Sequence, residues 1–263
     1  PYTTLFRSWA MPELAGLFNA GQGALVMNVG PLIVPVTKAQ FQSGNIDVYP
    51  IPPKLFSHND QASVWQASNP EGATEGWGGR LGDLALGSNG GSVFTCISAT
   101  GSGVFVSGAQ SLRYQVSHNG AVKVYALERG PWSQTSMLAT MRELMTEPRT
   151  HLLEHEYNRV VARSLGAEGQ VTAALSNVQL STSFAQGNPL AAELRIVARL
   201  IAARAALGVK RQVFLCSLGG FDHHDLLMEN HPGLLGRVNS ALASFQQSMV
   251  ELGLSEQVTT FTA

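Results

Sequence analysis

The stretch Leu218-Gly219-Gly220-Phe221-Asp222-His223-His224-Asp225 decides the expected fold and gathers most of the candidate chemistry. It follows residues 212–217, an apolar run without polar alternation, which predicts a parallel strand at the centre of a sheet, buried on both faces. It precedes Pro232-Gly233 and then residues 234–252, whose apolar spacing predicts an amphipathic helix. A buried strand, a polar loop and a helix in this order predict an α/β fold, in which ligands bind at the carboxyl ends of the strands.

The side chains that bind divalent metal ions are concentrated on this loop and just after it. They are Asp222, His223, His224 and His231. Carboxylate oxygens beside imidazole nitrogens suit a divalent ion such as Zn²⁺, Mn²⁺, Mg²⁺ or Ca²⁺. Gly219 and Gly220 would let the backbone turn sharply and come close to a bound substrate. The competing interpretation is a solvated polar turn, which any one of these histidines taken alone would fit.

A second polar motif, Ser57-His58-Asn59-Asp60, precedes a segment expected to be helical to about Ala67. Ser57 has the side chain and the position of a helix N-cap. The same place is the positive end of the helix dipole, where a phosphate or sulfate group binds and where a hydroxyl beside a metal ion could act as a nucleophile. His58 is then a catalytic or metal-binding candidate, and Asp60 a substrate-binding candidate. A capping serine without chemistry is the alternative.

A third motif, Gly76-Trp77-Gly78-Gly79-Arg80, is rich in glycine and leads into a helical pattern. It lacks the lysine of the P-loop pattern, so it is a weak signal for phosphate binding. Arg80 is a candidate clamp for an anionic substrate, and a plain surface arginine is the alternative.

Composition limits the classes of function. Of the 263 residues 44% are hydrophobic and only 13% are charged, about half the usual ~25%, which favours a sheet covered on both faces. The net charge of −1 gives no electrostatic reason to expect nucleic acid or an anionic membrane as a partner. No apolar run approaches the ~18 residues of a membrane span. Cys96 and Cys216 stand on separate apolar runs and are expected to be buried thiols.

The two ends of the chain look incomplete. Residues 1–8, PYTTLFRS, read as the in-frame translation of a sequencing adapter, so the α/β domain is expected to cover residues 9–263. Residues 257–262 have strand character and no turn follows them. We therefore expect an incomplete domain that binds metal weakly and is inactive by itself.

The rest of the chain predicts further helices and strands. Helices are expected at residues 13–20, 133–145 with Ser133 as its cap, 149–185 with an interruption near Gly166 and Gly169, and 190–207 with Asn188-Pro189 as its cap. Strands are expected at 24–29, 93–97, 103–106 and 122–126. The pair Asn119-Gly120 is a strong hairpin signal. His151 and His155 stand four residues apart on one helix face but lack the zinc-protease pattern. The expected fold is α/β, with a mainly parallel sheet, helices on both faces and a small antiparallel insertion near residues 90–127.

Together these motifs resemble the exported family catalogued as domain of unknown function 1501, within the alkaline-phosphatase/sulfatase-like superfamily. The resemblance rests on residues 24–30, Ser57-His58-Asn59-Asp60 with Trp65, residues 76–80 and residues 219–224. His223 stands where the family commonly has Thr, and Asn59 where it commonly has Phe. The resemblance implies an alkaline-phosphatase-like fold, export to the periplasm, Ser57 in the nucleophile position, and Asp222 with His224 as metal ligands. It also implies further ligands on segments before Trp9 and after Ala263.

The sequence therefore predicts a metal-dependent hydrolase of phosphate or sulfate esters or of a related small anionic substrate. Ser57 would be the nucleophile or would position the attacking water, and Asp222 and His224 would bind the metal, with His58, His223 and His231 in support. One alternative is a non-catalytic exported module that binds a metal or a partner through the same residues. Another is a zinc amidase or esterase, which would use the metal loop without needing Ser57.

Overall fold

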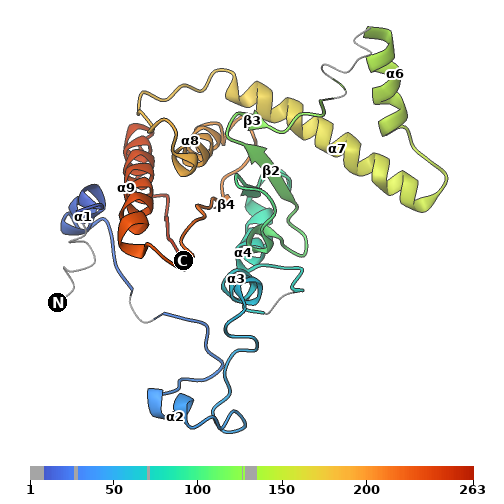
Figure 1. The fold of residues 1–263 in the computed structure, drawn as a ribbon. Coiled ribbons are helices and arrows are strands. Elements are labelled where there is room, and N and C mark those ends of the chain that lie inside the picture. The colour runs from blue at the N-terminus through green and yellow to red at the C-terminus, as the bar shows by residue number, and fades with distance from the viewer. Residues whose placement is uncertain (1–8, 27–28, 70–71, 126, 128–134) are drawn as a thin grey trace.

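The computed structural model describes residues 9–26, 29–69, 72–125, 127 and 135–263. The expected adapter-derived segment, residues 1–8, and the expected helix cap Ser133 lie outside these described residues. Within them the chain forms a mixed α/β fold around a small open sheet (Figure 1). No helix among the described residues is long and apolar enough to cross a membrane.

The sheet has four strands in the order β3-β2-β1-β4. The strands are β1 (Cys96–Ser98), β2 (Arg113–Ser117), β3 (Gly120–Ala121) and β4 (Val213–Leu215). β1 runs parallel to both β2 and β4, while β2 and β3 form an antiparallel hairpin in which Ser117 pairs with Gly120. The expectation of a mainly parallel sheet is confirmed, and so is the hairpin at Asn119-Gly120. The antiparallel part is smaller than the insertion expected near residues 90–127, because β1 and β2 pair in parallel and only β2 and β3 pair antiparallel.

β4, the strand before the loop that carries Asp222 and His224, lies at the edge of this sheet rather than at its centre. Among the described residues it pairs with β1 alone, for example through Val213 N–H donating to Thr95 O at 2.8 Å. Its three residues are half-buried, and the strand is shorter than the apolar run at 212–217. The expectation of a central strand was wrong. An apolar run indicates that both faces of a strand are covered, and helices can cover both faces of an edge strand as well as of a central one.

Helices pack on both faces of the sheet, as the apolar composition predicted. Consecutive residues of a strand point to opposite faces, and β1 shows this directly. Ile97 belongs to the larger core, with side chains of α7 (Leu152–Leu175), α8 (Pro189–Ala202) and α9 (Leu227–Glu251). Cys96 belongs to a smaller core with Trp77 and Phe105 on the other face.

α8 is the best-covered helix of the larger core. Asn188 caps its first turn by accepting a hydrogen bond from Ala191 N–H, and Pro189 follows at its first position, as the sequence predicted. Leu194, Val197 and Ile201 are buried on one stripe of the helix. Each such side chain contributes roughly 1.5–3 kcal/mol by leaving water, so the contact of α8 with the sheet and with α9 is the main apolar interface of the fold.

The smaller core explains the glycine-rich motif. α4 (Trp77–Ala85) and the 3-10 helix η3 (Val104–Val106) approach each other so closely that a Cβ atom would collide at several glycines of α4. A Cβ on Gly78 would meet the Phe105 ring, and one on Gly79 would meet the Ser107 backbone. The glycines therefore permit the close packing of α4 on η3. This packing explains the glycine-rich motif, which was a weak signal for phosphate binding in the sequence.

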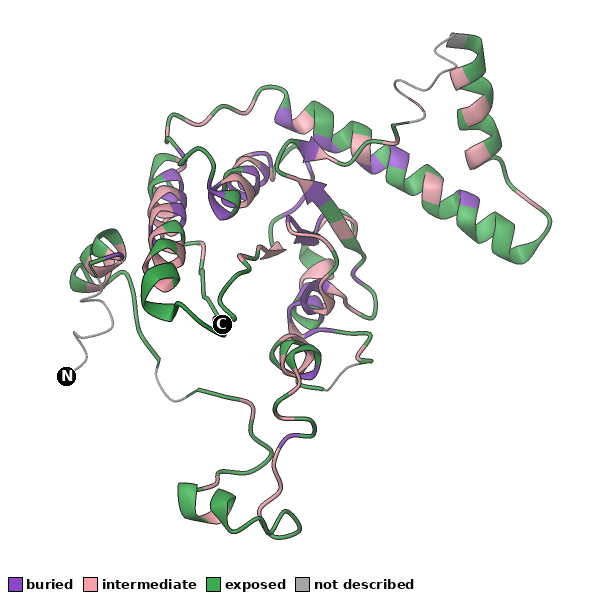
Figure 2. Ribbon diagram, in the orientation of Figure 1, coloured by how far each residue is buried: buried purple, intermediate pink, exposed green. Residues whose placement is uncertain are grey.

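Three parts of the chain extend from this body. α1 (Pro12–Asn19) docks on α9, where Leu14 N–H donates to Asn239 Oδ1 at 3.0 Å. α2 (Lys38–Gln42) lies on a long, largely exposed loop, and α6 (Thr135–Thr146) projects with the first half of α7 (Figures 1 and 2). The short 3-10 helix η2 (Leu86–Ser88) follows α4.

Several element boundaries differ from those expected. The described residues of 24–29, together with 122–125 and 257–262, form no strand, and residues 104–106 form a 3-10 helix instead of a strand. α7 continues through Gly166 and Gly169 and ends at Leu175. α9 begins at Leu227, seven positions before the expected start, with Pro232 inside it. Pro232 is the sixth residue of α9, so it lies past the first turn, where it removes one backbone hydrogen bond but does not mark the start of the helix.

Candidate metal centre

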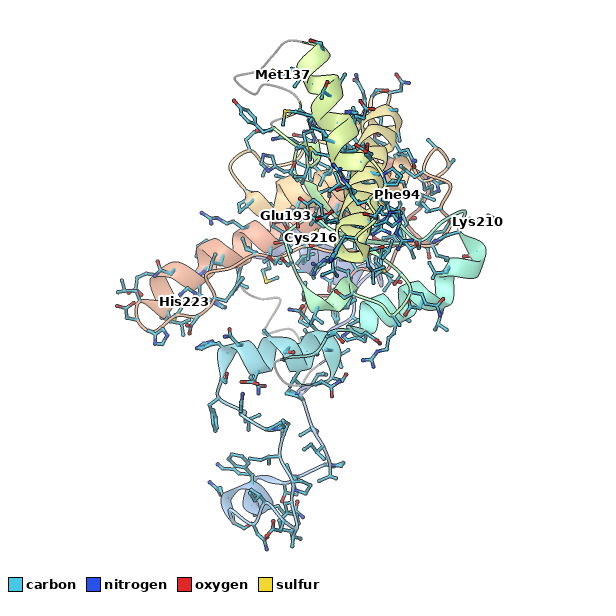
Figure 3. All side chains as sticks on the ribbon, turned by 90° about the vertical axis from the view of Figure 1, so that its right-hand side faces the viewer. Phe94, Met137, Glu193, Lys210, Cys216 and His223 are labelled. Carbon is cyan, nitrogen blue, oxygen red and sulfur yellow. The ribbon has the colours of Figure 1, made fainter. Side chains whose placement is uncertain are left out.

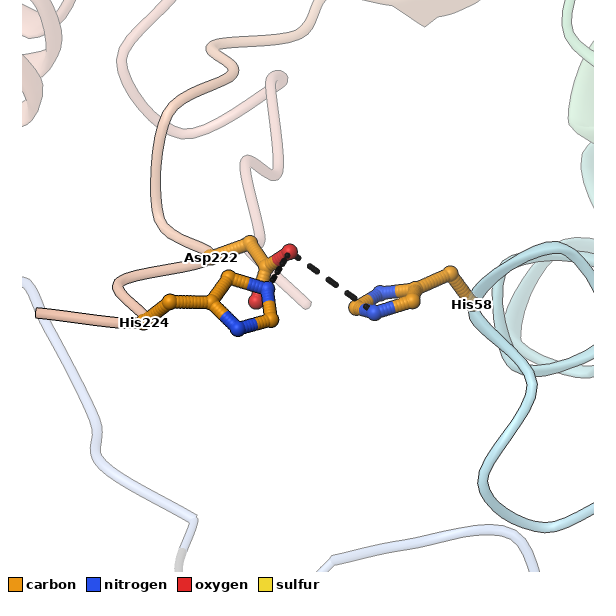
Figure 4. A group of neighbouring side chains, drawn as sticks. All are labelled: His58, Asp222 and His224. Atoms are coloured by element: carbon orange, nitrogen blue, oxygen red, sulfur yellow. Dashed lines mark hydrogen bonds and ion pairs between the residues drawn. The ribbon is translucent and has the colours of Figure 1, made fainter.

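Three side chains from distant parts of the sequence converge at one place: His58, Asp222 and His224 (Figure 4). His58 is the first residue of α3 (His58–Ala67), and the other two lie on the loop between β4 and α9. Each offers one ligand atom, and these atoms all lie within 4.8 Å of one another. The two polar motifs of the sequence thus meet in space.

The distances suit a single divalent ion. Asp222 Oδ2 lies 3.0 Å from His224 Nε2 and 3.7 Å from His58 Nε2. Ligands about 2.1 Å from a tetrahedral ion are about 3.4 Å apart, so these two separations bracket that value, and the atoms of the two histidines lie within 4.8 Å of each other. Two imidazole nitrogens and one carboxylate oxygen form a donor set that zinc and manganese accept. The residues present therefore fit the expected metal.

The loop that carries Asp222 and His224 is anchored at its start. Ser217 N–H donates to Glu193 Oε2 of α8 at 2.9 Å, and the hydroxyls of Ser217 and Thr100 are 2.5 Å apart. Burial raises the pKa of the Glu193 carboxyl, with the hydrogen bonds from Ser217 and Thr100 acting in the opposite direction. Figure 3 shows Glu193 close to Cys216, the residue after β4, whose thiol is influenced by the charge of Glu193. The loop thus leaves the sheet at a defined point.

Within the loop Gly220 has a φ of 97°, which other residues adopt only with strain. Leu226, just before α9, also has a positive φ, at 48°. Two left-handed residues on either side of Asp222 and His224 bend the chain so that these side chains face the amino end of α3. Gly219 and Gly220 are exposed, and both lie on the same loop as the candidate ligands.

Ser57 occupies the N-cap of α3, as the sequence predicted. Its hydroxyl accepts a hydrogen bond from Asp60 N–H at 3.4 Å, and its backbone is extended. His58, which follows it directly, supplies one of the converging ligand atoms. The free N–H groups of the first turn and the helix dipole favour an anion at this position. Ser57 therefore directly precedes one candidate ligand in the chain, on the helix end where an anionic substrate would be stabilised.

His223 and His231 lie together but apart from the three converging groups. Their ring centroids are 5.5 Å apart, and the Phe221 ring lies 5.8 Å from that of His231. His223 Nε2 and His231 Nδ1 are buried atoms that have no hydrogen-bond partner in the described structure. His224 thus faces α3, whereas His223 of the loop lies against His231, which belongs to α9.

Asp60 and Arg80 take positions that the sequence did not reveal. Asp60 is 2% exposed, and its Oδ1 lies 3.5 Å from Lys54 Nζ. Arg80 donates a hydrogen bond of 2.9 Å from its guanidinium to the carbonyl of Ala67, at the carboxyl end of α3. Arg80 is therefore at the opposite end of the helix from Ser57, where a cation satisfies a terminal carbonyl.

Two residues that sequence reasoning missed contribute to this region. Lys54 places an ammonium group beside Asp60, and Glu193 holds the start of the metal loop. Lys54 lies in a proline-rich loop with no motif to single it out. Glu193 interrupts the apolar pattern of α8, which was the one available signal.

The fold and this group of side chains together define a mixed α/β protein with a candidate metal centre on the loop after an edge strand. The chain belongs to the family described as Protein of unknown function (DUF1501), whose family model matches residues 7–263. No curated protein and no solved structure matches the chain.

Proposed function

We propose that this protein is a metal-dependent hydrolase of phosphate or sulfate esters or of a related small anionic substrate. The observation that carries the proposal is the convergence of His58, Asp222 and His224, with ligand atoms all within 4.8 Å of one another. A bound divalent ion would neutralise the anion and polarise the ester bond. An alkaline-phosphatase-like arrangement and export to the periplasm belong to the same proposal and rest on the sequence resemblance.

Ser57 is the proposed nucleophile, or the residue that orients the attacking water. Its hydroxyl is held at the amino end of α3 by the Asp60 N–H, and it precedes the ligand His58. A nucleophile needs its attacking oxygen beside the substrate and close to the groups that balance the developing charge. The free N–H groups of α3 would hold the oxygens of a phosphate or sulfate group next to this hydroxyl.

A metal-binding module without catalysis is the second candidate, and the exposure of the site favours it. All three converging residues are exposed. An exposed site excludes water poorly, and exclusion of water is what strengthens electrostatic stabilisation in most enzymes. This candidate keeps the three ligands and assigns Ser57 to helix capping alone.

Calorimetric titration of the purified chain with Zn²⁺ and with Mn²⁺, alongside turnover of an aryl phosphate and an aryl sulfate, tests the proposal. We expect one ion per chain and binding that is lost in Asp222→Ala. Three protein ligands are fewer than a closed structural site has, so weak affinity is expected. Turnover that needs both the metal and Asp222 supports the hydrolase over the binding module, whereas metal binding that persists unchanged in Asp222→Ala contradicts the proposed centre. A chain that binds neither ion overturns both.

A further inference from the structure

One apolar stripe along α7 is exposed to solvent in the first half of the helix and buried in the second half. Leu153, Tyr157 and Val160 are spaced four and three residues apart, and Ala167, Val171 and Leu175 continue the same face of the helix. The second set is covered, with exposed fractions of 4%, 0% and 5%. The first set is open, with exposed fractions of 73%, 65% and 41%. The same surface thus changes from core to solvent along one helix.

The neighbours of α7 explain the difference. The second half packs against β3 and the larger core, through residues such as Val171 and Leu175. The first half projects away from the sheet together with α6 (Figure 1), and its ribbon is mostly exposed (Figure 2). α6 meets α7 at another face, where Asn158 Nδ2 donates to the carbonyls of Leu144 and Glu147 at 3.2 and 2.7 Å. Among the residues that the structure describes, the stripe beginning at Leu153 therefore remains uncovered.

The charges beside the open stripe are self-complementary. Glu156 and Arg163 are seven residues apart, so they occupy the same edge of the stripe about two turns from each other. If a second copy of the helix lies antiparallel on this face, the Glu156 of each copy comes opposite the Arg163 of the other. The apolar centre of the contact then falls between Tyr157 and Val160. A hollow of about 520 Å³ lined by Arg149, Leu153, Glu154, Tyr157 and Asn158 lies on the same part of the helix.

We propose that the first half of α7 is a dimerisation surface, on which a second copy of this chain packs its own α7 antiparallel about a twofold axis. A twofold contact uses the same patch on both chains, and this patch has the required symmetry of apolar and charged groups. Three apolar side chains per copy form a small contact, so the dimer is expected to dissociate on dilution. The contact would place two candidate metal centres in one particle without altering either.

Adjacent leucines of α7 provide a matched test. Leu152 and Leu153 are both strongly exposed, at 78% and 73%, but only Leu153 lies on the stripe. In sedimentation velocity over a concentration series we expect a reversible monomer–dimer equilibrium for the unaltered chain. Leu153→Arg should weaken the dimer by at least about tenfold, the effect of losing ~1.4 kcal/mol, while Leu152→Arg should leave it unchanged.

Charge reversal separates the proposed contact from a loss of folding. Glu156→Arg and Arg163→Glu alone each place like charges opposite one another and should weaken the dimer. The double variant restores opposite charges across the axis and should recover most of the association. Glu156 also bonds to Arg159 within its own helix, with Arg159 Nε at 2.8 Å, and the double variant does not restore that pair. Recovery therefore reports the contact between chains.

Two results would overturn the proposal. One is a chain that sediments as a monomer at every concentration, which would leave the stripe to a different kind of partner. The other is an equal loss of association in Leu152→Arg and Leu153→Arg, with unaltered helical circular dichroism in both.

Discussion

The Nε2 atom of His58 lies 3.7 Å from Oδ2 of Asp222. This contact joins the amino end of α3 to the loop after β4, and His224 approaches the same carboxylate oxygen at 3.0 Å. Without a metal, the hydrogen bond between the His224 ring and this oxygen holds Asp222 in place. In the proposed metal-bound state, the same three side chains would supply the ligand atoms, which lie within 4.8 Å of one another in this structure.

Loss of a converging ligand should weaken metal binding. His58→Ala and Asp222→Ala each remove one of three donor atoms, and we expect each to lower the affinity for Zn²⁺ by at least ~100-fold, because even loss of an outer-shell partner costs 10–100-fold. His155→Ala is the matched control, since His155 is an exposed histidine on α7 away from these groups. Calorimetric titration compares the three. An equal effect of all three substitutions would mean that binding is not at this centre.

Substitutions at Ser57 separate capping from chemistry. Ser57→Ala removes the side chain that accepts the Asp60 N–H and should cost ~1 kcal/mol of stability, whereas Ser57→Asn keeps a capping oxygen and should cost little. If the hydroxyl is the nucleophile, both variants lose turnover of an aryl phosphate or aryl sulfate, and only Ser57→Ala loses stability in a denaturant titration. Full activity in Ser57→Asn would remove the nucleophile role.

Asp83 should stabilise the fold in a pH-dependent way. Its carboxylate accepts hydrogen bonds from the backbone N–H groups of Ala109 at 2.8 Å, Gln110 at 3.1 Å and Ser111 at 2.6 Å. Desolvation raises the pKa of Asp83, but these hydrogen bonds and that of the Ser111 hydroxyl outweigh it, so the pKa lies below the ordinary 3.8. The stabilisation is therefore present above pH 3.8 and is lost as the pH falls through the depressed pKa.

The measurement is the free energy of unfolding of Asp83→Asn and of the unaltered chain across pH. At pH 7 we expect a loss of ~1–2 kcal/mol, since hydrogen bonds to a charged group are among the stronger ones and this carboxyl is only partly buried. The two curves should converge at acid pH. A difference that stays constant down to pH 3 would show that the charge of Asp83 does not contribute.

The sequence was sufficient where local chemistry decides structure. Ser57 and Asn188 were recognised as helix caps, and Asn119-Gly120 as a hairpin turn, because these roles depend on a few neighbouring residues. The position of β4 at the edge and the separation of His223 from His224 were not predicted. Both depend on which segments pack beside the loop after β4, and a single sequence carries no signal for such long-range contacts.

Two glycines should respond in opposite directions to the same substitution. A Cβ at Gly79 would collide with the Ser107 backbone, whereas one at Gly166 of α7 has nothing within 4 Å. We expect Gly79→Ala to destabilise the chain by ~3 kcal/mol, because a backbone neighbour cannot move aside as a side chain can. Gly166→Ala should instead stabilise it by ~0.5–1 kcal/mol through helix propensity. Thermal unfolding checks both, and a neutral Gly79→Ala would contradict the close packing of α4 on η3.

Cys216 should resist alkylation in the native protein. Burial raises the pKa of its thiol from the ordinary 9.0 to about 12, and the negative charge of Glu193 adds to this shift. Because the thiolate is the reactive form, three pKa units lower its fraction at pH 8 by roughly 1,000-fold. Labelling by iodoacetamide, followed by peptide mass spectrometry, should therefore be slow at Cys216 in the native chain and fast in denaturant.

The contribution of Glu193 to this resistance can be measured separately. Glu193→Gln removes the negative charge near Cys216, so the thiol pKa falls and labelling becomes faster. The amide still offers an oxygen to Ser217 N–H, whose bond to Glu193 is 2.9 Å long, so the loop should stay anchored. Cys96, a buried thiol in the smaller core whose raised pKa owes nothing to Glu193, is the internal control. Faster labelling of both cysteines in Glu193→Gln would indicate loosening of the whole fold, whereas faster labelling of Cys216 alone would locate the effect in the carboxylate that holds the metal loop.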